Sequence, residues 1–397
     1  MNVCYARTDM NELQTTFDDT PRREARNTAP PLKILLAGGG TGGHLFPAIA
    51  IAEAFRKQTG AVEILFVGTR RGLEQKVLPS LGFRLATLDV EGIKGKGLRN
   101  KFRAFLKLPG SLLEARRILR TYSPDLVIGV GGYSSGPAVL MAFLLGVPTA
   151  VAEQNAVPGT TNRILGRFVD RIFLTFPDDG KWFAPRKTLV TGNPIRSAFL
   201  SGGEGSKQTD DRFGLLIFGG SHGSHAINTA ALAALEELSD IRGGLRIVHQ
   251  TGDRDWTEVE EAYRAKGIPA EILPFITDMP GVFREADLVI CRAGATSIAE
   301  ITASGKASIL IPYPFAVADH QTQNARVLAE AGAAEMVKES DLTGERLAVL
   351  IRRYLERPDT RRDMEDRSRR LGNPRAAEDI VKECLVFAQR KRNRSRS

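Results

Sequence analysis

The hydrophobic positions of this chain form short apolar runs, which alternate with longer stretches whose apolar residues recur every three or four positions. Short runs are typical of strands buried on both faces, and the longer spacing is typical of amphipathic helices. Runs of the first kind lie at residues 32–37, 63–67, 126–130, 149–152, 171–174, 214–218, 246–250, 288–291 and 307–311. Helical patterns separate them, for example at residues 47–58 and 226–238. The alternation predicts an α/β fold with parallel sheets and helices on both faces.

Two segments about 180 residues apart repeat one pattern. In each, a predicted strand runs into a glycine-rich turn, GGGTGGH at residues 38–44 and GGSHGS at residues 219–224, and then into a helix. We therefore predict two Rossmann-like domains with parallel sheets facing a cleft, separated by a segment of linker composition. The predicted division is an extension (1–31), a first domain (32–196), a linker (197–212), a second domain (213–375), and a helix bracing the first domain with a basic tail (376–397).

The composition agrees with this reading. A chain of 397 residues with 42% apolar and 25% charged residues is typical of a globular protein with two domains of ordinary size. Cys4, Cys291 and Cys384 fit no metal-ligand spacing, so we interpret them as reduced thiols. The most apolar stretch, residues 137–152, is broken by a glycine and a proline, which favours a buried helix followed by a buried strand over a membrane span. Residues 1–31 lack a signal-peptide core and are interpreted as a disordered extension.

The net charge of +9 is unevenly spread, with nine basic residues and one acid between positions 94 and 120. Within residues 98–113, apolar and basic side chains alternate at helical spacing, which is typical of a helix lying on an anionic bilayer. The alternative is a core-packed helix with a solvated basic face. No aromatic-rich RNA-binding motif or helix-turn-helix pattern accompanies the charge, so we expect no nucleic-acid partner.

Glycine-rich turns at helix starts bind phosphates, because the first N–H groups of a helix are unpaired and its dipole is positive there. Gly38, Gly40 and Gly43 satisfy the dinucleotide fingerprint GxGxxG. That fingerprint also needs an acid at the end of the second strand to hold ribose. Here the second strand ends at Gly68-Thr69, so a dehydrogenase is disfavoured.

Two more candidate turns, GGYSSGP at residues 131–137 and EQN at residues 153–155, also follow predicted strands. Open α/β sheets bind ligands at the carboxyl ends of their strands. Any one of these clusters is equally well read as a tight turn. Four of them on one chain disfavour a purely structural role.

Seven motifs occur in the order found in the MurG family of bacterial glycosyltransferases: GGTGGH (39–44), GGYSSGP (131–137), EQN (153–155), GNPIR (192–196), GGS (219–221), CRAGATSIAE (291–300) and DHQTQN (319–324). The chain resembles this family over residues 32–390. The resemblance implies a GT-B fold and an inverting hexosyltransferase of peptidoglycan synthesis. Its donor would be UDP-N-acetylglucosamine and its acceptor the 4-hydroxyl of the muramyl residue of undecaprenyl-diphospho-N-acetylmuramoyl-pentapeptide (lipid I to lipid II). It also implies that the enzyme acts at an anionic membrane surface, the cytoplasmic face of the bacterial inner membrane.

The resemblance implies a role for individual residues. Ser221 and Arg196 would hold the donor diphosphate, and Ile276 would pair with uracil through its backbone. Glu300 would accept both ribose hydroxyls, in a pocket lined by Ala295, Thr296, Ser297, Ile298 and Ala299. Gln321 and Asn155 would bond the sugar, Thr41, Gly42 and Gly43 would approach the donor from the first domain, and the acceptor would meet Gly131, Gly132 and Tyr133. An alternative reading of residues 297–300 is a helix capping box.

His44 is the candidate general base, because an imidazole with a pKa of about 6.5 accepts protons near neutral pH. Its alternatives are helix capping and binding of the acceptor diphosphate. The departing UDP would be stabilised by a helix dipole and Arg196, so we expect neither a metal nor a cofactor. Asp253 and Asp255 are interpreted as loop charges. The alternative functions are another GT-B activity, such as glycolipid glycosylation, and UDP-N-acetylglucosamine epimerisation.

Overall fold

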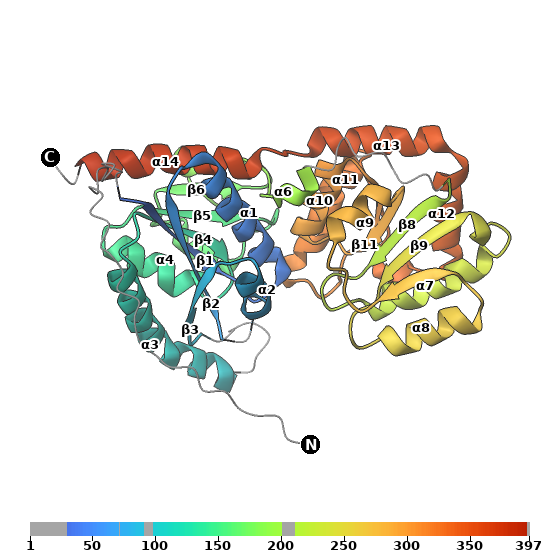
Figure 1. Cartoon of the computed structure of the whole chain (residues 1–397), viewed down its shortest axis with the longest axis horizontal. Coiled ribbons are helices and arrows are strands. Elements are labelled where there is room, and N and C mark those ends of the chain that lie inside the picture. The colour runs from blue at the N-terminus through green and yellow to red at the C-terminus, as the bar shows by residue number, and fades with distance from the viewer. Residues whose placement is uncertain (1–29, 71, 91–97, 201–210, 395–397) are drawn as a thin grey trace, which may run out of the picture. The chain divides into compact units, whose positions relative to one another are not determined.

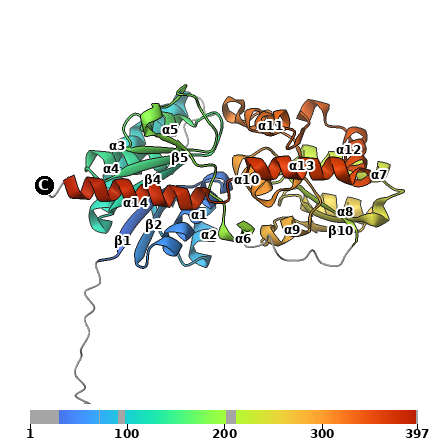
Figure 2. The same cartoon turned by 90° about the horizontal axis from the view of Figure 1, so that it is seen from above.

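A computed structural model describes residues 30–70, 72–90, 98–200 and 211–394, and of residues 98–107 and 390–394 only the backbone. The predicted extension, much of the linker and the end of the basic tail therefore lie outside the described residues. Residues from Leu32 onward form a single compact unit. Within it, Figures 1 and 2 show two sheets, each covered by helices.

In the described residues the first sheet has seven parallel strands in the order β3-β2-β1-β4-β5-β6-β7. Its strands are β1 (Leu32–Gly38), β2 (Val62–Thr69), β3 (Arg84–Leu88), β4 (Leu126–Gly131), β5 (Thr149–Glu153), β6 (Arg171–Leu174) and β7 (Thr188–Val190). The helices between them are α1 (Gly42–Gln58), α2 (Glu74–Ser80), α3 (Leu98–Tyr122), α4 (Ser135–Leu144) and α5 (Thr160–Leu165).

The apolar runs of the central strands are buried on both faces of this sheet. In β1, Ile34 and Leu36 belong to one core, whereas Leu35 and Ala37 belong to the core of the opposite face. The apolar run therefore reflects burial on two faces rather than a helical core.

The second sheet repeats this plan over the described residues, with six parallel strands in the order β10-β9-β8-β11-β12-β13. They are β8 (Phe213–Phe218), β9 (Leu245–Gln250), β10 (Ala270–Leu273), β11 (Leu288–Cys291), β12 (Ala307–Leu310) and β13 (Glu335–Met336). Its helices are α7 (His225–Glu237), α8 (Trp256–Ala265), α9 (Met279–Glu285), α10 (Ala295–Ser304), α11 (His320–Glu330), α12 (Gly344–Glu356) and α13 (Pro358–Leu371). The predicted architecture of two Rossmann-like parallel sheets is confirmed.

Two helices lie outside this alternation. The short α6 (Ser197–Leu200) follows the first sheet and packs Phe199 against Phe283 of α9, with ring centroids 5.4 Å apart. The last helix, α14 (Ala376–Arg394), continues from α13 and packs along α1 of the first sheet (Figures 1 and 2). Its side chains Ile380, Val381 and Cys384 are part of the first-sheet core. The chain thus returns to the first sheet after completing the second.

The most apolar stretch forms α4 and β5, as predicted, but α4 is not buried along its whole length. Phe143 and Leu144 at its C-terminal end are exposed. Among the described residues, no helix is both long enough and apolar enough to cross a membrane.

Candidate active site

The strand order fixes where a ligand binds. In both sheets the chain reverses direction across the sheet beside its first strand, between β1 and β4 and between β8 and β11. Ligands bind open parallel sheets at this reversal, outside the carboxyl ends of the strands. The turns there are the glycine-rich turns at residues 38–43 and 219–224, together with residues 131–134 and 292–294. The glycine-rich turns found in the sequence therefore lie where the sheet topology predicts a ligand.

The buried carboxylate of Glu74 holds the first glycine turn in place by hydrogen bonds. Glu74 accepts hydrogen bonds from the N–H of Gly40 (2.8 Å) and from the N–H and hydroxyl of Thr69 (2.7 and 2.8 Å). Gly39 passes so close that a Cβ there would lie 2.6 Å from this carboxylate. The glycine is needed for this approach. The turn leaves Thr41 as the N-cap of α1, with Gly42 and Gly43 in its first turn.

His44 follows in the first turn of α1, and its imidazole packs on the turn after β4. A Cβ at Gly131 would lie 2.7 Å from ring atoms of His44, and Gly131 has φ +95°, so only glycine fits. Nδ1 of His44 lies 3.2 Å from Oε1 of Gln154, at the end of β5. Gly132 lies against Gly39, and the neighbouring Tyr133 is exposed. The candidate base and the candidate acceptor turn are thus in contact.

The Glu153–Asn155 segment connects the first sheet to the second. Buried Glu153 accepts from the N–H groups of Asn155 and Gly159 (3.0 Å each), which closes the loop. Asn324 of α11 donates to Oδ1 of Asn155 (3.3 Å) and accepts from the N–H of Ala156 (3.0 Å). The amide of Asn155 is therefore held at the contact between the two sheets' loops.

A second contact between these loops follows from a proline in α1. Pro47 has no N–H, so the carbonyl of Gly43, four residues earlier, lacks its usual partner in the helix. Thr296 of α10 donates its hydroxyl to that carbonyl (3.3 Å). Thr41, Gly42 and Gly43 consequently lie beside the start of α10.

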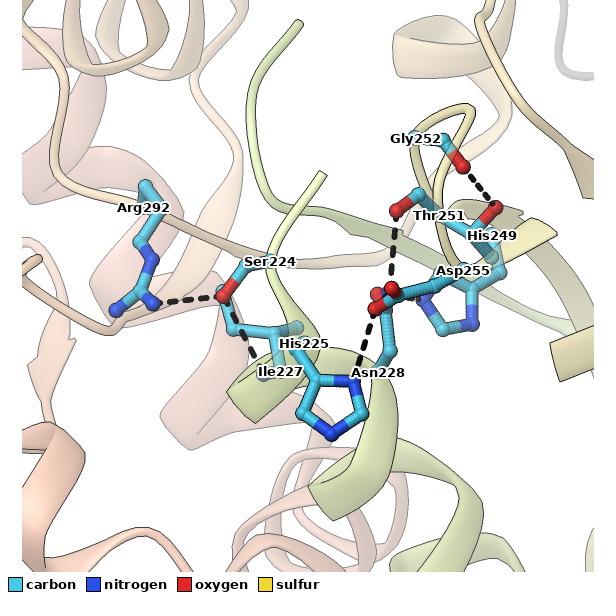
Figure 3. A network of polar contacts seen from close by, with 9 residues as sticks. All are labelled: Ser224, His225, Ile227, Asn228, His249, Thr251, Gly252, Asp255 and Arg292. Atoms are coloured by element: carbon cyan, nitrogen blue, oxygen red, sulfur yellow. Dashed lines mark hydrogen bonds and ion pairs between the residues drawn. The ribbon is translucent and has the colours of Figure 1, made fainter. Parts of the chain in front are cut away.

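The glycine turn after β8 exposes Ser221 and ends at Ser224, the N-cap of α7. Figure 3 shows Arg292 reaching this cap: its Nη2 donates to the Ser224 hydroxyl (2.6 Å), which in turn accepts from the N–H of Ile227. Arg292 also donates to the carbonyls of Ile311 and Pro312 (3.3 Å each). One guanidinium thus ties together the turns after β8, β11 and β12.

The same figure shows a buried network beneath the start of α7. Asn228 donates to the carbonyl of Thr251 (3.0 Å) and to Asp255 (2.8 Å), and His249 contacts Asn228. His249 also contacts buried Tyr263. Burial lowers the pKa of His249 to about 3, so this imidazole is neutral at physiological pH. Asp255 is engaged by Asn228 and His225. In the part of the chain that the structure describes, no three metal-ligating side chains gather.

Gln250 joins the glycine turn to the segment predicted to bind uracil. Its Nε2 donates to the carbonyl of Gly220 (2.8 Å), and its Oε1 accepts from the N–H of Ile276 (2.8 Å). Both Gln250 and Ile276 are buried. The Ile276 N–H is therefore already engaged, whereas its carbonyl takes no part in this contact.

We predict that Gln250→Met weakens UDP binding about 10-fold, because each of the two hydrogen bonds that align these loops contributes about 0.5–1.5 kcal/mol. Titration calorimetry with UDP checks this. The exposed Gln75→Met in the first domain is the matched control and should leave the affinity unchanged. An unchanged affinity in Gln250→Met would show that the two loops are aligned without it.

Glu300 and Arg196 form an ion pair across the start of α10. Nη2 of Arg196 lies 3.2 Å from Oε1 of Glu300, and the guanidinium lies between the rings of Phe46 and Phe199, at 4.3 and 5.0 Å from their centroids. Burial raises the pKa of Glu300 to about 7, although Arg196 lowers it. The capping-box alternative is wrong, because α10 begins at Ala295 with Gly294 as its N-cap. Ser297 is thus already inside the helix, with Ile298 and Ala299 buried beside it.

This pKa predicts that UDP-N-acetylglucosamine binds more tightly as pH rises. In the role predicted for Glu300, a ribose diol donates to its carboxylate, whereas the free protein holds Glu300 protonated below its pKa of about 7. Affinity should therefore fall about 30-fold between pH 8 and pH 5.5. Calorimetry without acceptor measures this, since a diphosphate esterified at both ends does not titrate in this range. Glu300→Gln should abolish the dependence, and a flat wild-type profile would contradict it.

Gln321, at the start of α11, accepts from the N–H of Tyr313 (2.9 Å), which leaves its NH₂ group to donate to a sugar. The structure therefore brings together, around the contacting loops, residues predicted from both domains. Sequence reasoning assigned no role to Glu74, Gln154, Gln250, Arg292 or Asn324. Each of the five has a hydrogen-bond partner at least 30 residues away in the chain. Of the five, Gln154, Arg292 and Asn324 lie inside motifs that were recognised.

Residues 34–174 match the glycosyltransferase family 28 N-terminal domain, and residues 214–382 match the C-terminal domain of the same family. A protein of Syntrophus aciditrophicus named UDP-N-acetylglucosamine–N-acetylmuramyl-(pentapeptide) pyrophosphoryl-undecaprenol N-acetylglucosamine transferase is 57% identical over 356 residues, 90% of this chain and 99% of that protein. A Myxococcus xanthus protein of the same name is 47% identical over 354 residues, 89% and 92% of the two chains.

Solved structures agree. The crystal structure of Acinetobacter baumannii MurG matches with a TM-score of 0.70 and 32% identity, covering 90% of this chain and 100% of that one. A UDP-N-acetylglucosamine 2-epimerase from Neisseria meningitidis matches with a TM-score of 0.63 but 16% identity, covering 89% and 100%, so that likeness shows only the fold. The chain therefore belongs to glycosyltransferase family 28 and, within it, to the MurG family of N-acetylglucosamine transferases.

Proposed function

We propose that this enzyme transfers N-acetylglucosamine from UDP-N-acetylglucosamine to the 4-hydroxyl of the muramyl residue of undecaprenyl-diphospho-N-acetylmuramoyl-pentapeptide, with inversion at the sugar. Relatives at 47–57% identity over most of the chain bear the name of this reaction. The observation that carries the proposal is the contact between Thr296, at the start of α10, and the carbonyl of Gly43, at the start of α1. It holds the start of α1, which carries His44, beside the second domain, whose glycine-rich turn at the start of α7 suits a diphosphate.

On this proposal, the second domain binds the donor. The diphosphate lies at the start of α7, where Ser221 and the first-turn N–H groups donate to it. The uracil pairs with the backbone of Ile276, and Glu300 accepts from the ribose. Arg196, already beside Glu300, shifts toward the diphosphate. Asn155 and Gln321 bond the sugar, with Thr41, Gly42 and Gly43 approaching from the first domain.

The transfer step needs one proton acceptor and a stabilised leaving group. Nε2 of His44 takes the proton of the muramyl 4-hydroxyl as that oxygen forms its bond to C1 of the sugar. The bond from C1 to the diphosphate oxygen breaks, and UDP leaves with the electron pair. Its added negative charge is stabilised by the α7 dipole and Arg196. The acceptor itself lies along Gly131, Gly132 and Tyr133.

Acceptor-dependent release of UDP tests the reaction. The enzyme should release UDP from UDP-N-acetylglucosamine when the muramyl lipid is present, and not with an acceptor lacking the muramyl 4-hydroxyl. An epimerase would convert the nucleotide sugar without releasing UDP. Equal release with and without acceptor would contradict the proposal.

We propose further that the first domain docks on the anionic cytoplasmic face of the bacterial inner membrane, where the lipid acceptor resides, and that nucleic acid is not a partner. Four exposed apolar residues support this. They form the α4–α5 patch, in which the rings of Phe143 and Phe168 lie 5.5 Å apart: Phe143, Leu144, Ile164 and Phe168. Arg163 and Arg167 are exposed in the same segment. An apolar centre with a basic border suits an anionic bilayer.

The stretch predicted from sequence, residues 98–113, begins α3, which packs beside α4. The side chains of its first ten residues lie outside the described part of the chain. Of the remainder, Leu108 and Leu113 are exposed. Both lie on α3, which packs beside α4, and the core-packed alternative does not hold for these two side chains.

We predict that the wild type sediments with phosphatidylglycerol vesicles at low salt and is partly released at high salt, since each basic residue contributes about 1 kcal/mol and is screened. A triple variant in which Leu144, Ile164 and Phe168 are replaced by serine should no longer sediment with the vesicles and should bind UDP normally. The matched control is Val349→Ser, an equally exposed apolar residue on α12. A triple variant that still sediments would place the membrane contact elsewhere.

A further inference from the structure

The imidazole of His44 is held by one buried side chain. Gln154, 1% exposed, places its Oε1 3.2 Å from Nδ1 of His44. On the other side the ring packs on Gly131, where no side chain fits. The ring is therefore held in position from two sides. A neutral imidazole carries its proton on one nitrogen only, and the partner of that nitrogen decides which.

The orientation of the Gln154 amide is determined by its second contact. Its Nε2 donates to the carbonyl of Ala152 (3.1 Å). A carbonyl only accepts hydrogen bonds, so the NH₂ group must face Ala152 and the oxygen must face His44. That oxygen also only accepts, which requires a proton on Nδ1.

From this geometry we infer that Gln154 fixes the neutral imidazole of His44 as its Nδ1–H tautomer and so leaves the lone pair on Nε2. The inference rests on the proposed function where it gives the tautomer a use, because a general base needs that lone pair. Gln154 is then a positioning residue, which never touches the substrate. The tautomer itself is a property of the free enzyme.

A substitution can remove the acceptor without leaving a buried group unpaired. The carbonyl of Ala152 also accepts from Nδ2 of Asn162 (3.1 Å), so it keeps a partner in Gln154→Met. Methionine has a similar length and no acceptor of comparable strength. In this variant, Nδ1 of His44 is the only one of these groups that loses its hydrogen-bond partner.

The test is a ¹⁵N spectrum of enzyme labelled at its five histidines, at about pH 8.5, with His44→Ala identifying the His44 signals. We expect a protonated Nδ1 and an unprotonated Nε2 in the wild type, and a mixture of tautomers in Gln154→Met. Turnover in Gln154→Met should fall about 2- to 4-fold, because one neutral hydrogen bond shifts the ratio of the two tautomers about 3- to 10-fold. UDP affinity should be unchanged. Gln75→Met is the control for the effect of a glutamine-to-methionine substitution elsewhere in the first domain.

A wild-type spectrum with the proton on Nε2 would overturn the inference whatever the reaction. So would a Gln154→Met spectrum identical to that of the wild type. Failure of the proposed base is a separate result, because normal turnover in His44→Ala would refute that role while the spectrum still reports the tautomer.

Discussion

Replacing His44 by alanine should lower turnover by about 10²- to 10⁴-fold, the range for removal of a general base. The reason is that the variant has no group to take the proton of the acceptor hydroxyl as the new bond forms. UDP affinity should change little, because His44 lies on α1 of the first sheet, whereas most of the proposed donor contacts come from the second domain. Steady-state kinetics with saturating donor and acceptor measures the effect.

Two alternatives give different results. If His44 binds the acceptor diphosphate, the variant will keep near-normal turnover and require far more acceptor. If His44 only caps the start of α1, the variant will unfold at a lower temperature with little loss of turnover. Calorimetry with UDP is the control for an intact second domain.

Glu300→Ala should weaken UDP binding by about 2–4 kcal/mol, or about 30- to 1000-fold, because two charge-assisted hydrogen bonds to ribose are lost. Glu300 sits in a buried environment that raises its pKa, and such sites are often functional. Glu300→Gln, which retains one acceptor oxygen, should have an intermediate effect. Titration calorimetry with UDP gives both values.

The matched control is Glu285→Ala, which removes the carboxylate of another partly buried ion pair, with Arg246 at 3.1 Å. It should leave UDP affinity unchanged. If Glu300→Ala also binds UDP normally, Glu300 does not contact the donor and its role is limited to the ion pair with Arg196.

The central strands were predictable from the sequence because burial on both faces gives them continuous apolar runs. Four strands escaped prediction: β3, β7, β10 and β13. All four are edge strands of their sheets, and most of their side chains are partly or fully exposed. An edge strand has a partner on one side only and less burial, so its sequence resembles that of a loop. Periodicity therefore predicts the middle of a sheet better than its edges.

The site was predictable where it depends on local chemistry. A glycine-rich turn at a helix start has the same meaning in any context, and such turns led to residues 38–44 and 219–224. Pairing partners were not predictable, because His44 and Gln154 are 110 residues apart and Arg196 and Glu300 are 104 apart. Only the fold brings them together. The start of α10 was misplaced in the capping-box alternative because Gly294, not a serine, is the N-cap.

The transfer of sugar label to the lipid acceptor measures the proposed reaction directly. Enzyme is incubated with UDP-N-acetylglucosamine labelled in the sugar and with the undecaprenyl-linked muramyl-pentapeptide, and the products are partitioned between butanol and water. We expect label to enter the lipid phase with wild-type enzyme, and to enter it far more slowly with His44→Ala. Label that stays in the aqueous phase as an isomerised nucleotide sugar, with none in lipid, would contradict the account.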